Sequence, residues 1–85
     1  MSRADVNGDV WSLSEFRGQN AQILHLNLTE SEARRLRCLG IFEGQSIELQ
    51  KAGSPMILSA AGGRVAISQE IARRIVVQAS DHQAA

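Results

Sequence analysis

Apolar and polar residues alternate in a way that predicts three consecutive strands in the second half of this chain. Residues 45–50 place Ile47 and Leu49 on one face, which is typical of a strand with one side buried. A short apolar run covers 56–60, and alternation returns over 64–68. The Gly62-Gly63 pair between them tolerates a tight turn, so these segments are expected to form a meander.

Two further strands are predicted outside the meander. Residues 75–77 are a β-branched run that predicts a closing strand. Residues 19–28 predict an opening strand, although its two faces are not cleanly separated. One face carries Ala21, Ile23 and His25, and the other carries Gln22, Leu24 and Leu26.

Capping signals predict one helix and two short turns. Thr29 and Glu32 form a capping box ahead of Ala33, Leu36 and Leu39, which make up the expected buried stripe, and Gly40 ends the helix. Ser12 and Glu15 form a similar box, but Gly18 limits that element to about one turn. Ser68 is expected to cap a turn over 69–74.

The expected fold class is therefore mainly β. About five strands, one α-helix inserted after the first strand and a short C-terminal helical turn predict a small, partly open β-barrel. With 85 residues the chain has room for one domain, expected over 11–78, with flexible tails at 1–10 and 79–85.

Composition narrows the function classes. Nine basic and nine acidic residues give a formal net charge of zero, which disfavours general binding of polyanions. The single cysteine, Cys38, excludes an intramolecular disulfide, and no apolar run is long enough to span a bilayer. We therefore expect a cytoplasmic protein.

Candidate catalytic and metal-binding residues are few. His25 and Cys38 could form a base and nucleophile pair, but no third group is implied, and no phosphate-binding or zinc-protease motif occurs, so we expect no enzymatic activity. A metal site would have to combine His25 and Cys38 with a carboxylate such as Glu32 or Glu43. We expect no resident cofactor, with weak binding of a divalent ion such as Fe²⁺ as the alternative.

Basic residues gather on the predicted helix. Arg34, Arg37 and Cys38 fall together on the side away from the buried stripe, and Arg73-Arg74 form a second pair. Such a face can be merely solvated or can bind a partner. Nucleic acid would require exposed aromatic residues, and we expect Trp11, Phe16 and Phe42 to pack in the core or at its edge.

The run Arg35-Leu-Arg-Cys-Leu-Gly-Ile-Phe-Glu-Gly44 resembles the R-L-x-x-L-G-[hydrophobic]-x-x-G signature of the FeoA family, ferrous iron transport protein A. The segments 13–18, 21–24, 54–56 and 71–77 resemble the corresponding parts of that family, so the resemblance covers about 11–77. Two positions depart from the family pattern, which has a Leu-Arg pair at Ile67-Ser68 and a larger residue at Gly53.

This resemblance implies an SH3-like β-barrel with a helical insertion. It also implies a cytoplasmic partner of FeoB, the membrane protein that imports Fe²⁺ and carries a GTPase domain, so contact with the membrane would come only through that partner. We expect the transporter to be contacted by Arg34, Arg37 and Cys38 together with the loop residues Gly53, Ser54 and Pro55.

Three alternatives remain open from the sequence. The domain could be an SH3-like regulator that binds a divalent transition metal ion weakly. It could bind nucleic acid, which zero net charge disfavours. Self-association through a barrel edge would add a homo-oligomer to any of these functions.

Overall fold

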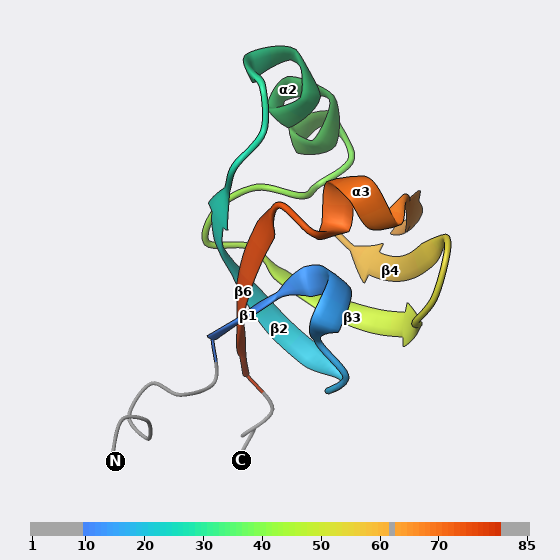
Figure 1. Ribbon diagram of the computed structural model, residues 1–85. Coiled ribbons are helices and arrows are strands. Elements are labelled where there is room, and N and C mark those ends of the chain that lie inside the picture. Colours follow the sequence, from blue (N-terminus) through green and yellow to red (C-terminus); the bar gives the residue numbers. More distant parts are fainter. Residues whose placement is uncertain (1–9, 62, 81–85) are drawn as a thin grey trace.

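The computed structural model describes residues 10–61 and 63–80, which form one antiparallel sheet with short helical elements (Figure 1). The order of the six strands is β1-β6-β2-β3-β4-β5. Their bounds are Val10–Ser12 for β1, Asn20–Leu26 for β2, Ser46–Lys51 for β3, Met56–Ala60 for β4, Gly63–Ile67 for β5 and Ile75–Ala79 for β6. The mainly β class is confirmed, but six strands replace the predicted five, and the sheet is open with β1 and β5 at its edges.

The strand missed by sequence analysis is β1. Val10 pairs with Gln78 and Trp11 with Val77, so β1 lies beside the last strand of the chain. Three residues are too few to show the alternation that marks a strand, and β1 therefore owes its structure to β6. The predicted boundaries move accordingly: Val10 and Ala79, both assigned to the tails, are paired in the sheet. The predictions for 1–9 and 81–85 lie outside the described residues.

The unclear faces of β2 are explained by an irregularity in its pairing. The register of β2 against β6 shifts between Ile23 and His25, as in a β-bulge. Ala21 and Ile23 face the core before the shift, and Leu26 packs against the core after it. The expectation that His25 shares the inner face was wrong, because the extra residue turns it outward and leaves it exposed.

The predicted capping box at Ser12 is not formed. The element that follows is a single 3-10 turn, η1 (Leu13–Glu15), in which the Phe16 N–H donates to the Leu13 carbonyl at 3.1 Å. Ser12 makes no side-chain cap, and its Oγ donates instead to the Arg73 carbonyl at 3.1 Å. The turn nevertheless places Leu13 and Phe16 in the core.

The inserted helix, α2 (Glu30–Cys38), begins after the predicted capping box and ends at the C-cap residue Leu39, one residue before Gly40. The Glu32 N–H donates to Thr29 Oγ1 at 3.2 Å, and Glu32 Oε1 accepts from the Thr29 N–H at 3.0 Å. At the other end Gly40 has a φ of +89°. There the Gly40 N–H donates to the Arg37 carbonyl and the Ile41 N–H to the Leu36 carbonyl, which is the Schellman pattern.

A second short helix, α3 (Gln69–Ala72), connects β5 to β6. Ser68 caps it as predicted, because Ser68 Oγ accepts from the Ile71 N–H at 3.2 Å. The helical turn is shorter than the predicted 69–74, since β6 begins at Ile75 and Arg74 donates through its N–H to Ile71. None of the helices among the described residues is long and apolar enough to cross a membrane.

The core is made entirely of apolar side chains from the strands and the helical elements. Its members are Leu13, Phe16, Ala21, Ile23, Leu36, Ile41, Ile47, Met56, Leu58, Val65, Ile67, Ala72, Ile75 and Val77. Only Leu36 comes from α2, which lies at one end of the sheet (Figure 1). Most side chains of α2 therefore lie outside the core.

Candidate functional site

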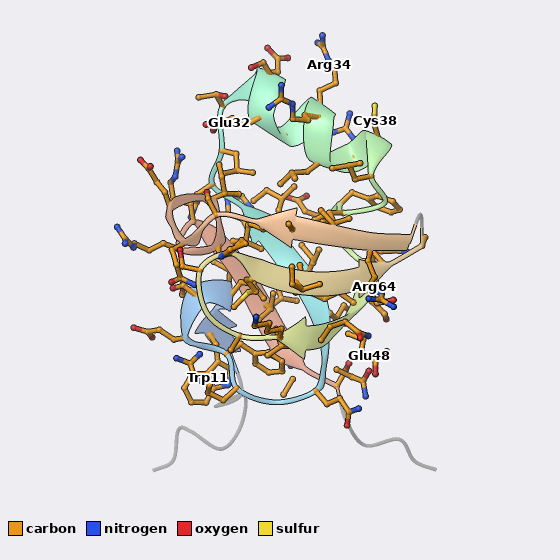
Figure 2. The ribbon with its side chains drawn as sticks, turned by 90° about the vertical axis from the view of Figure 1, so that its right-hand side faces the viewer. Trp11, Glu32, Arg34, Cys38, Glu48 and Arg64 are labelled. Carbon is orange, nitrogen blue, oxygen red and sulfur yellow. The ribbon has the colours of Figure 1, made fainter. Side chains whose placement is uncertain are left out.

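The outer face of α2 carries the basic residues that the sequence places there. Arg34, Arg37 and Cys38 are all exposed, and Arg34 and Cys38 point away from the sheet (Figure 2). Within residues 10–61 and 63–80 the ion pairs join His25 to Glu43 and Arg74 to Glu32. The guanidinium groups of Arg34 and Arg37 therefore have no carboxylate partner in that part of the chain.

A groove runs beside α2 on the side of β2, and we call it the α2–β2 groove. It has a volume of about 390 Å³ and is lined by Leu26, Ala33, Arg37, Phe42 and Glu43. The β-bulge places Leu26 here, and the turn after Gly40 brings Phe42 and Glu43 alongside the helix. The result is an apolar trough with charged groups along it.

Glu43 is held in place at this groove by two contacts. Its Oε2 lies 3.2 Å from His25 Nδ1 and accepts a hydrogen bond from the Leu26 N–H at 3.4 Å. Both side chains of the pair are more than half exposed, so water screens their interaction and the pair contributes little to stability. The Glu43 carboxylate thus has contacts within the protein, whereas Arg37 pairs with no carboxylate in the part of the chain that the structure describes.

A second, smaller groove flanks the opposite side of α2, and we call it the α2–β5 groove. Its volume is about 230 Å³, and Leu36, Leu39, Ala66, Ile67 and Ile71 form its apolar walls. Glu32, Arg35 and Ser68 add polar groups. Leu39 was expected in the buried stripe, but it is the C-cap residue beyond the last helical turn and is 40% exposed.

Glu32 connects α2 to the segment that precedes β6. Its Oε2 lies 3.4 Å from Arg74 Nη2. The hydrogen bond from the Thr29 N–H lowers the pKa of Glu32 below its ordinary value of 4.5, and the positive charge of Arg74 adds to this effect, while partial desolvation opposes it. The carboxylate is therefore ionised at neutral pH and serves the fold.

The predicted loop residues Gly53, Ser54 and Pro55 lie elsewhere. They are exposed in the connection between β3 and β4, which is well separated from α2 (Figure 1). This loop is tied to α3, because Gln69 Nε2 donates to the Gly53 carbonyl at 2.6 Å. The structure thus brings Arg34, Arg37 and Cys38 together on one helix, and leaves the loop as a separate surface.

The candidate metal ligands are likewise only partly brought together. His25 and Glu43 are in contact, whereas Glu32 pairs with Arg74 and Cys38 points outward from α2. Among the residues the structure describes, no three side chains of His, Cys, Asp or Glu form a group that could hold a metal ion. The same placement separates Cys38 from the sheet that carries His25.

The aromatic residues divide between core and surface. Phe16 is buried as expected, Trp11 lies on the edge strand β1 and is 43% exposed, and Phe42 is 37% exposed at the α2–β2 groove. Sequence analysis assigned Phe42 to packing and so missed its place in the groove. The available signal was its position directly after Ile41, because a buried side chain in an extended segment leaves the next side chain on the opposite side.

Comparison with known proteins identifies a family whose sequence pattern matches this chain and solved structures that share its fold. The sequence pattern of the FeoA domain matches residues 13–79. A crystal structure of an iron uptake regulatory protein, FeoA, is 26% identical with a TM-score of 0.73, covering 81% of this chain and 96% of that one. No curated protein matches the chain.

Two further solved structures share the fold. FeoA of Stenotrophomonas maltophilia, complexed with zinc and described as a prokaryotic SH3 domain protein and a candidate ferrous iron transport activating factor, is 28% identical with a TM-score of 0.60. The match covers 80% of this chain and 89% of that one. The solution structure of FeoA from Chlorobium tepidum is 24% identical with a TM-score of 0.72, and the match covers 85% and 76% of the two chains.

Proposed function

This chain belongs to the FeoA family, and we propose that it is a non-enzymatic accessory protein of ferrous iron uptake. In this proposal it acts in the cytoplasm, docks on the cytosolic part of an FeoB-type transporter, and modulates the assembly or activity of that transporter. The family match over residues 13–79 supports the link to ferrous iron transport.

The observation that carries the docking proposal is the surface around α2. Exposed arginines that pair with no carboxylate of the described residues lie beside an apolar groove whose wall includes a partly exposed phenylalanine. Aromatic and arginine side chains are the residues that most often dominate protein interfaces. A core of apolar residues with a charged rim is the usual composition of such a surface.

Calorimetry tests the docking proposal directly. The whole protein is titrated into the purified GTPase domain of the ferrous iron transporter from the same organism, with and without a GTP analogue and Fe²⁺, and then into the full-length transporter in detergent. Binding in any of these states is expected. Absence of binding to both the domain and the full-length transporter would contradict the proposal.

Charge reversal then locates the contact. We expect the double variant Arg34→Glu with Arg37→Glu to bind the transporter more weakly, because it reverses the charge on the outer face of α2. The matched control is Lys51→Glu with Arg64→Glu, which changes the net charge equally at exposed positions of β3 and β5. Circular dichroism confirms that both variants fold.

A divalent metal function is the second candidate, favoured by the contact between His25 Nδ1 and Glu43 at 3.2 Å and by the zinc complex of the Stenotrophomonas maltophilia relative. Imidazole and carboxylate suit a late first-row divalent ion. Titration with Fe²⁺ under anaerobic conditions separates the two candidates. Binding that is lost in His25→Ala and retained in Cys38→Ala would favour this second function, and no binding would exclude it.

A further inference from the structure

We infer that the α2–β2 groove recognises a partner segment in which acidic residues flank an apolar side chain. The inference rests on the proposed function, because it names the chemistry of the docking partner. In the bound state the apolar side chain would lie among Leu26, Ala33 and Phe42, and an acidic side chain would pair with Arg37.

The apolar part of the argument comes from the walls of the groove. Leu26 packs against the core, Ala33 offers a small side chain on α2, and the partly exposed ring of Phe42 forms another part of the lining. The volume of about 390 Å³ is within the range of sites that take small apolar groups. Covering these walls would remove apolar surface from water.

The charge of the expected partner follows from what is already paired. Glu43 also lines the groove, but its Oε2 accepts from the Leu26 N–H and contacts His25. Arg37 lines the same groove, and no carboxylate of the described residues pairs with it. Arg34 lies one helical turn away from Arg37 and extends the basic rim, so two positive charges stand beside the one carboxylate of Glu43 and the net charge at the groove is positive.

The second groove provides an internal contrast. Its charged lining residues are Glu32 and Arg35, and Glu32 is engaged by Arg74 and by the Thr29 N–H. Arg35 is therefore a matched control for Arg37: both are exposed arginines of α2, and each lines a different groove. The same charge reversal at the two positions tests which side of the helix binds.

The first experiment uses the full-length transporter and compares three variants. We expect Arg37→Glu and Phe42→Ala to weaken binding by about tenfold or more, as loss of a central interface residue does, and Arg35→Glu to bind within about twofold of the wild-type protein. Equal binding of all three variants would overturn the groove proposal while leaving the docking proposal standing. Absence of wild-type binding would contradict the docking proposal instead.

The second experiment decides the groove proposal without the transporter. The wild-type protein selects from a phage-displayed library of random peptides, and the enriched peptides are synthesised and titrated. We expect peptides in which Asp or Glu flanks Leu, Ile, Met or Phe, and we expect their binding to be lost in Phe42→Ala and Arg37→Glu but kept in Arg35→Glu. No enrichment, or binding that Phe42→Ala leaves unchanged, would overturn the proposal.

Sedimentation equilibrium tests whether a second copy of this chain, and not another protein, binds in the groove. A wild-type protein that is dimeric, with Phe42→Ala and Arg37→Glu monomeric, would show that a second copy of this chain fills the groove, and would overturn the proposal of an acidic partner segment. A monomeric wild-type protein agrees with it.

Discussion

At the scale of single residues, Glu32 links the start of α2 both to its own capping residue and to the segment before β6. One carboxylate oxygen accepts from the Thr29 N–H and so completes the capping box, while the other faces Arg74 ahead of β6. The hydrogen bonds of the capping box satisfy backbone N–H groups at the start of the helix, whereas water screens the partly exposed ion pair with Arg74. The cap is therefore the larger reason why α2 begins at Glu30.

We expect this carboxylate to make stability depend on pH. The pKa of Glu32 is lowered in the folded protein, so the carboxylate stabilises the fold above its unfolded pKa, and this contribution is lost as the pH falls through the folded pKa. Urea denaturation at pH 7 should therefore find Glu32→Gln less stable than the wild-type protein. The difference should shrink as the pH falls below 4.5.

The control for this measurement is Glu30→Gln. This variant removes the same charge from the same helical turn, where no described hydrogen bond uses the side chain. If both variants differed from the wild-type protein equally at every pH, the charge of the Glu32 carboxylate beside the Thr29 N–H and Arg74 would not be the cause.

At the scale of elements, β2 shows how one irregularity redistributes side chains. The register shift between Ile23 and His25 turns Leu24 and His25 outward and returns Leu26 to the core side. The same shift brings His25 to Glu43 and places Leu26 in the wall of the α2–β2 groove. The bulge therefore builds the groove as well as the strand.

Alanine substitution at two adjacent positions tests this description of β2. Ile23 is fully buried, so Ile23→Ala should cost about 2 to 5 kcal/mol of stability. Leu24 is 39% exposed, so Leu24→Ala should cost less than about 1 kcal/mol. Chemical denaturation measures both, and equal losses at the two positions would contradict the inward direction of Ile23 and the outward direction of Leu24.

At the scale of the whole molecule, α2 is attached to the sheet by a small part of its surface. Leu36 is its one buried residue, and grooves lie on both of its sides. The strands β2 and β6, in contrast, bury Ile23, Ile75 and Val77 completely. The surface proposed to bind a partner thus lies on a helix with a single buried residue.

Hydrogen exchange should reveal this difference. Regions with few buried apolar contacts open locally at lower free energy than the core does. We expect the amide protons of 34–38 in α2 to exchange faster than those of Ile23 and Val77, and a bound partner to slow the exchange in α2. Protection of α2 equal to that of β2 and β6 would show that the helix opens only with the whole fold.

The sequence by itself determined the features that depend on neighbouring residues. Thr29, Glu32 and Gly40 mark the ends of α2 because capping groups and a left-handed residue act within a single helical turn. Alternation marks β3 and β5 because successive side chains of a strand face opposite sides, and a short apolar run between them marks β4. The exposed basic face of α2 follows from helical spacing alone.

Only the tertiary structure decided the features that depend on distant parts of the chain. β1 exists because β6 lies beside it, and the inward or outward direction of Leu24, His25 and Leu26 depends on how β2 pairs with β6. The α2–β2 groove needs side chains from a strand, a helix and the turn after it. Such a groove has no pattern in a short stretch of sequence, since packing between elements sets the space that their side chains leave.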